Sequence, residues 1–120
     1  MEIGIKDIEY HLPEFCLTNE IISRENPSWD MDLVSQRSGV STRYLAKDGE
    51  TAYDLALAAC EAMLDRHEGS RNQIDGILFC TQGRDYNMPS NACVLQNQLG
   101  LSDSVFALDF SLGCAGYIYG

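Results

Sequence analysis

The pattern of apolar and polar positions predicts helices and strands that follow one another along the chain. The clearest helix covers residues 52–66, which contain neither Gly nor Pro. Thr51 and Asp54, three residues apart, form the signature of a capping box at its start. Because its apolar residues lie on nearly every side, we expect this helix to be buried. Two short apolar runs, residues 74–81 and 105–110, predict strands covered on both faces.

Shorter elements are predicted around this segment. They are a first strand at 3–10, helices at 20–25 and 30–37 with Gly39 ending the second, an extended segment at 41–46, and a helix opened by Pro89 and followed by Gly100. Helices that alternate with strands predict an α/β fold with a parallel or mixed sheet and helices on both faces.

Length, composition and charge restrict the classes of function. The 120 residues are 45% apolar, which suits one domain or an incomplete part of a larger one. The net charge of −10 argues against a nucleic-acid partner, because binding phosphates requires a basic patch. No apolar run is long enough for a membrane helix, and the N-terminus lacks the regions of a signal peptide. We therefore expect a cytoplasmic protein with no membrane partner.

The five cysteines include no Cys-x-x-Cys pair, so the sequence predicts neither a metal site nor a disulfide framework. We expect reduced thiols, four of them small buried side chains. Cys114 differs because it follows the strand predicted at 105–110 and has small residues on both sides. A sharp turn from strand to helix is the arrangement of a nucleophile elbow, and the N-terminus of a helix favours a thiolate. From spacing alone, a buried nucleophile and a buried thiol beside a tight turn remain equal alternatives.

Four segments together resemble β-ketoacyl-acyl-carrier-protein synthase III. They are residues 37–43 (RSGVSTR), 50–56 (ETAYDLA), 88–100 (MPSNACVLQNQLG) and 109–117 (DFSLGCAGY), in the family's order and spacing. The last resembles the family's active-site segment. The resemblance implies a thiolase-like layered α/β fold, with residues 1–120 as its incomplete N-terminal part, a mixed sheet and buried helices.

The resemblance also implies an activity and its partners. Cys114 would take an acyl group from acyl-coenzyme A and pass it to a carbanion formed from malonyl-acyl carrier protein, in fatty acid or related biosynthesis. Coenzyme A thioester would be a substrate, no further cofactor would be needed, and the enzyme would be a homodimer. The family's catalytic His and Asn lie downstream of the Cys. We expect His11 and His67 to be surface residues, and these 120 residues alone to be inactive.

Three further residues match positions that bind substrate in the family. Arg37 would meet the coenzyme A nucleotide or its phosphate, and its alternative is a surface salt bridge. Leu33 stands where the family commonly has a Trp that stacks on adenine, and Trp29 lies one helical turn earlier. Met88 stands where a Phe often reaches across the dimer into the acyl pocket, and plain interface packing is its alternative.

Two other readings of the whole chain remain. One is another condensing enzyme of the thiolase superfamily, such as a hydroxymethylglutaryl-CoA synthase-like or secondary-metabolite enzyme. The other is a non-catalytic fragment or assembly partner that keeps the fold.

Overall fold

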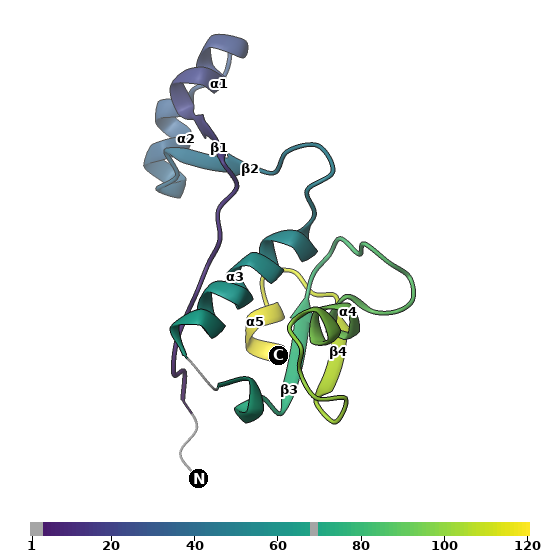
Figure 1. Ribbon diagram of the computed structural model, residues 1–120. Coiled ribbons are helices and arrows are strands. Elements are labelled where there is room, and N and C mark those ends of the chain that lie inside the picture. The colour runs from purple at the N-terminus through teal and green to yellow at the C-terminus, as the bar shows by residue number, and fades with distance from the viewer. Residues whose placement is uncertain (1–3, 68–69) are drawn as a thin grey trace. The chain divides into compact units, whose positions relative to one another are not determined.

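The computed structural model describes residues 4–67 and 70–120 (Figure 1). The chain divides into two compact units, one of residues 12–50 and one that combines residues 1–11 with residues 51–120. In the described part of the chain no helix is long and apolar enough to cross a membrane. The predicted α/β composition is confirmed, with two separate two-stranded sheets where one mixed sheet was expected.

The unit of residues 12–50 is a pair of helices framed by two antiparallel strands. Its elements are β1 (Phe15–Thr18), α1 (Asn19–Glu25), α2 (Met31–Ser38) and β2 (Thr42–Leu45). The Asp30 carboxylate accepts the Leu33 N–H at 2.9 Å and so begins α2, and Gly39, with a φ of 72°, ends it. Both predicted helices and the extended segment at 41–46 are thus confirmed.

The strand predicted at 3–10 is wrong for the residues that the structure describes. Residues 4–10 are extended without being part of a sheet, and Ile5, Ile8 and Tyr10 are exposed. Ile3 lies outside the described residues. Alternation makes a strand only where a partner strand offers hydrogen bonds, and among the described residues the sheets pair only β1 with β2 and β3 with β4. The partner exists instead for Phe15–Thr18, which pairs with β2.

The other unit carries the candidate site. Its elements are α3 (Ala52–Arg66), a 3₁₀ turn (Ser70–Gln73), β3 (Gly76–Cys80), α4 (Asn91–Gln98), β4 (Phe106–Phe110) and α5 (Gly116–Tyr119). The capping box of Thr51 and Asp54 is present, as predicted. Strands β3 and β4 are parallel, with register pairs running from Gly76–Phe106 to Cys80–Phe110. Both strands therefore end at the same edge of their sheet.

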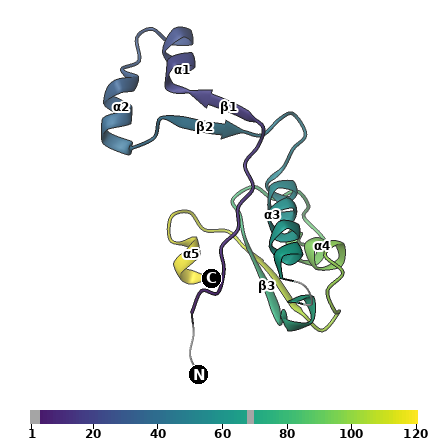
Figure 2. The same cartoon turned by 60° about the vertical axis from the view of Figure 1, so that its left-hand side comes forward.

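The core of this unit lies on one face of the β3–β4 sheet. Figure 2 shows α3 and α4 on that side and α5 on the other. Alternate strand residues Ile77, Phe79 and Ala107 point into the core, where they meet α4 and one stripe of α3. That stripe consists of Tyr53, Ala56, Leu57, Cys60 and Leu64. The prediction of a helix buried on all sides is therefore wrong here, because only this stripe contacts the core.

The opposite face of the sheet is apolar and exposed. Leu78, Phe106 and Leu108 keep 48%, 57% and 46% of their surface accessible. The expectation that both strands are covered on both faces is thus wrong for this chain, although their sequence is that of strands with two apolar faces.

Helix α4 is fixed to β4 by one carboxylate. The two oxygens of Asp109 accept the backbone N–H groups of Asn91 and Ala92 at 2.8 and 2.7 Å, and Ser90 caps the same end. These bonds place the helix start at Asn91, so the prediction that Pro89 occupies its first position is wrong. Gly100, with a φ of 64°, follows the helix as predicted.

Replacing Asp109 by Ala should lower the free energy of unfolding by about 1–3 kcal/mol, because two partly buried N–H groups lose their acceptor. Denaturant unfolding measures this, with Asp103→Ala on an exposed turn as the control. An equal loss in both variants would show that the cap contributes nothing of its own.

Candidate functional site

Cys114 lies in the turn that joins β4 to α5. The Gly116 N–H donates to the Gly113 carbonyl at 2.8 Å and closes this turn around Cys114 and Ala115. Ala115 is the N-cap of α5, so Cys114 stands one residue before the cap and not in the first helical turn. The predicted strand–turn–helix order is confirmed. The thiol is exposed, so the expectation that it is buried is wrong for this chain.

The end of β3 supports this turn from beside it. The Thr81 N–H donates to the Phe110 carbonyl at 3.2 Å, and the Cys80 thiol donates to the Leu112 carbonyl at 3.7 Å. The Gln82 amide nitrogen lies 3.6 Å from the point where a Cβ on Gly113 would be. Sequence reasoning had not singled out Cys80 or Gln82, because their contacts with residues 112 and 113 depend on the register of two strands.

The other cysteines are less buried than expected. Cys16 and Cys60 are half-buried, whereas Cys80 and Cys93 are exposed. Burial raises the pKa of the Cys60 thiol, and the negative charge of Glu61 adds to the shift. Cys60 therefore has less thiolate character than an unperturbed thiol, which makes it a useful reference in labelling experiments.

The residues matched to substrate binding fall in both units. Leu33 and Arg37 are four residues apart on α2, so they share one helix face, and both are exposed. Within residues 4–67 and 70–120 Arg37 forms no ion pair. The alternative that Arg37 serves in a surface salt bridge therefore has no support among these residues. Met88 is 89% exposed in the loop between β3 and α4, and Trp29 is 59% exposed just before α2.

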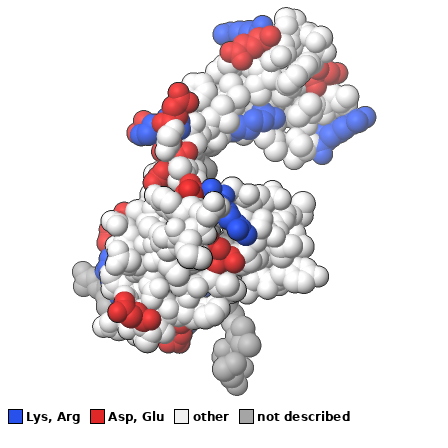
Figure 3. Space-filling view, turned by 90° about the vertical axis from the view of Figure 1, so that its right-hand side faces the viewer, with Lys and Arg blue, Asp and Glu red and all other residues white. Residues whose placement is uncertain are grey.

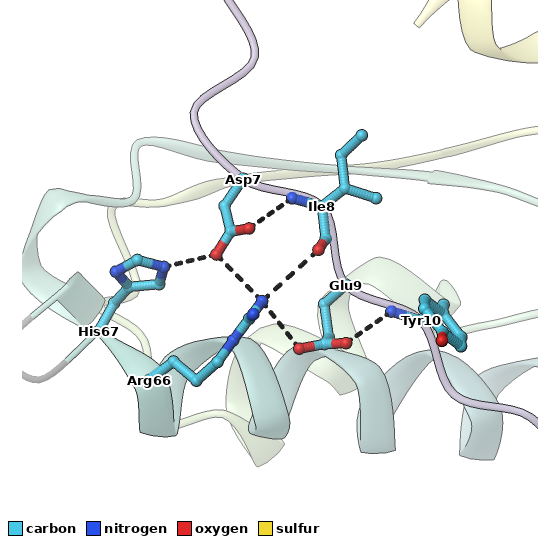
Figure 4. A network of polar contacts seen from close by, with 6 residues as sticks. All are labelled: Asp7, Ile8, Glu9, Tyr10, Arg66 and His67. Atoms are coloured by element: carbon cyan, nitrogen blue, oxygen red, sulfur yellow. Dashed lines mark hydrogen bonds and ion pairs between the residues drawn. The ribbon is translucent and has the colours of Figure 1, made fainter.

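The two histidines lie at the surface, as expected. His67 caps the C-terminus of α3, and its Nε2 lies 2.6 Å from Oδ2 of Asp7 (Figure 4). Arg66 bridges Asp7 and Glu9 at 3.0 and 2.8 Å, which fixes the N-terminal segment to the end of α3. The hydrogen bond from His67, with the Ile8 N–H and Arg66 contributing, holds the pKa of Asp7 below its usual value. The contact of His67 with Asp7 therefore supports a structural role for this histidine.

The described residues contain no group of three or more His, Cys, Asp or Glu side chains that could hold a metal ion. On the face shown in Figure 3, the basic side chains are separated by uncharged surface and form no continuous patch. The groups that lie around the turn are the Cys114 thiol, backbone amides and the Gln82 side-chain amide, and a thiol beside amide donors is suited to acyl transfer.

Comparison with known proteins gives similarity over nearly the whole chain. No protein-family model matches. The β-ketoacyl-[acyl-carrier-protein] synthase III of Ruegeria pomeroyi is 35% identical over 115 residues, which are 96% of this chain and 35% of that protein. The enzyme of the same name from Thiobacillus denitrificans is 35% identical over 91% of this chain and 34% of its own. The chain thus spans about a third of the length of these relatives.

Solved structures agree with the sequence comparison. A 3-oxoacyl-(acyl-carrier-protein) synthase III structure matches with a TM-score of 0.88 and 39% identity, over 97% of this chain and 34% of its own. The synthase III of Thermus thermophilus matches with a TM-score of 0.84 and 32% identity, over 98% and 36%. OleA of Xanthomonas campestris matches with a TM-score of 0.76 and 25% identity, over 93% and 34%. The chain is therefore similar, over nearly its whole length, to about one third of β-ketoacyl-acyl-carrier-protein synthase III, and it has the thiolase-like fold of the corresponding part.

Proposed function

We propose that this chain supplies the nucleophile-bearing, N-terminal part of a condensing acyltransferase, with Cys114 as the residue that accepts the acyl group. The observation that carries the proposal is the exposed thiol at the edge where two parallel strands end. In open α/β sheets, ligands bind beyond the carboxyl ends of the strands. Similarity to proteins named synthase III supports condensation as the reaction proposed for this thiol.

The chemistry follows from the thiol. The Cys114 thiolate attacks the carbonyl carbon of an acyl-coenzyme A, a sulfur–carbon bond forms, and coenzyme A leaves as a thiolate that then takes up a proton. Backbone N–H groups of the turn, other than that of Gly116, which already donates to the Gly113 carbonyl, are proposed to donate to the oxyanion. Exchange of one thioester for another is nearly isoenergetic, so the acyl group stays activated for the next step.

In that next step, a carbanion formed by loss of carbon dioxide from malonyl-acyl carrier protein attacks the acyl carbon and displaces the Cys114 thiolate. The product is a β-ketoacyl chain, which places the reaction in fatty acid or related biosynthesis. Coenzyme A serves as a substrate carrier, and no metal or redox cofactor takes part in either step. We propose that the side chains which promote decarboxylation, a His and an Asn in the family, are not among these 120 residues.

Arg37 and Leu33 are proposed to meet the coenzyme A nucleotide. A guanidinium that is free of a carboxylate partner in the described residues can bind phosphate or stack on adenine. Leu33 offers an apolar contact where an aromatic side chain would stack. Met88, almost fully exposed, is proposed to reach the acyl pocket of a second subunit in a homodimer. The five free thiols suit a cytoplasmic location.

Two alternatives receive less support. Another condensing enzyme of the thiolase superfamily would share the fold, as the OleA match illustrates, but the synthase III relatives are more similar in sequence. A non-catalytic assembly partner would not need the exposed thiol of Cys114.

The first step is tested by release of coenzyme A from an acyl-coenzyme A. We expect at most one equivalent per chain in the absence of malonyl-acyl carrier protein, and none from Cys114→Ala, because that variant lacks the proposed acyl acceptor. Cys93→Ala, which removes an exposed thiol elsewhere, is the matched control and should behave as wild type. Equal release by Cys114→Ala would refute the assignment.

Nucleotide binding is tested by replacing Arg37 with Ala. In single-turnover acylation of Cys114, the apparent KM for acyl-coenzyme A should rise roughly tenfold while the maximal rate constant stays nearly unchanged, since a hydrogen bond to a charged group contributes about 1.5–3 kcal/mol. Leu33→Trp should lower KM through stacking. Arg24→Ala, an exposed arginine at the end of α1, is the control. If Arg37→Ala has the same KM as Arg24→Ala, the nucleotide binds elsewhere.

A further inference from the structure

The helix that follows Cys114 rests on the sheet through two glycines. Gly116 is the first residue of α5, and Gly120, four residues later, is its C-cap, so the two lie on the same side of this helical turn. A Cβ built on Gly116 would lie 2.5 Å from the Cys80 sulfur, and one built on Gly120 would lie 2.8 Å from the ring of Phe110. Cys80 and Phe110 are register partners in β3 and β4. The two glycines therefore meet two adjacent side chains at the ends of the strands.

The contact at Gly116 is the more rigid of the two. Phe110 approaches Gly120 with the far end of its ring, which can swing aside. Cys80 approaches Gly116 with a sulfur only two bonds from the backbone, and that thiol also donates to the Leu112 carbonyl at 3.7 Å. Gly116 is itself buried. The sulfur therefore lies beside both Leu112 and Gly116, and a methyl group added at Gly116 would displace either the Cys80 side chain, with its bond to the Leu112 carbonyl, or the backbone of the turn.

Cys114 lies between these two contacted residues. Leu112 precedes it by two positions and Gly116 follows it by two, and the Gly116 N–H closes the same turn onto Gly113. A shift of either contacted residue therefore moves the backbone that carries the nucleophilic thiol.

We propose that Cys80 is a positioning residue for Cys114. The Cys80 side chain packs under the turn of residues 112–116 and holds its backbone in place. This packing requires a glycine at position 116, because a side chain there would overlap the Cys80 sulfur. An effect of Cys80 on acyl transfer rests on the function proposed above, whereas the contact between Cys80 and Gly116 does not. Cys80 is not proposed to react with substrate.

A pair of substitutions tests the contact directly. Gly116→Ala places a methyl group against the Cys80 sulfur, and Cys80→Ala removes that sulfur, so the double variant regains the space. The readout is the rate at which iodoacetamide alkylates each cysteine, measured by peptide mass spectrometry in the whole chain. This readout needs no acyl donor.

Because iodoacetamide attacks the thiolate, and the immediate surroundings of a thiol set its thiolate fraction and its accessibility, we expect the displaced turn of Gly116→Ala to slow alkylation of Cys114 at least about threefold. The double variant should return to within about twofold of wild type, which a general loss of stability would not produce. Gly83→Ala, where a Cβ has no neighbour within 4 Å, is the matched control and should leave the rate unchanged.

Labelling of Cys60 serves as the internal monitor of folding, because this half-buried thiol reacts faster if the unit opens. An unchanged Cys114 rate in Gly116→Ala overturns the proposal. A double variant that stays slow overturns it, as does slowing accompanied by faster Cys60 labelling. The acyl-transfer proposal is judged separately, by coenzyme A release from wild type: a chain that releases none but shows the alkylation rescue keeps the positioning role and loses the proposed reaction.

Discussion

The parallel pairing of β3 with β4 is the constraint on which the candidate site depends. Because both strands run the same way, the residues that follow them, Thr81 and Ser111, emerge at one edge of the sheet. There the Thr81 N–H binds the Phe110 carbonyl, and the turn that carries Cys114 is built directly beyond it. In an antiparallel pair the residues after the two strands would lie at opposite edges.

Because side chains alternate along these strands, the two faces of the sheet contact different parts of the unit. On one face, Phe79 and Ala107 contribute to the core, and Asp109 fixes the start of α4 through two backbone N–H groups. On the other face, Cys80 lies against Gly116 at the start of α5, and Phe110 lies against Gly120 just after its end. The segment that leads to Cys114 is therefore held from both sides, by a carboxylate one residue before the end of β4 and by a thiol beneath the turn.

Local patterns predicted the local structure well. The capping box at Thr51, the helix ended by Gly39 and the strand–turn–helix segment around Cys114 each depend on residues that are close in the sequence. Features that depend on distant partners were not predictable in this way. The pairing of β1 with β2, the cap from Asp109 to α4, and the contact between Cys80 and Gly116 each join residues more than 15 positions apart. The false strand at residues 4–10 shows the same limit, since alternation cannot reveal whether a partner strand exists.

The most direct test of this account is to locate the acyl group after incubation of the chain with an acyl-coenzyme A. Peptide mapping by mass spectrometry compares all five cysteines in one experiment, so each serves as a reference for the others. The account predicts an acyl group on Cys114, with none on half-buried Cys60, whose pKa burial raises. An acyl group spread evenly over the exposed cysteines, or concentrated on Cys80, would contradict the claim that the turn beyond β4 makes Cys114 the nucleophile.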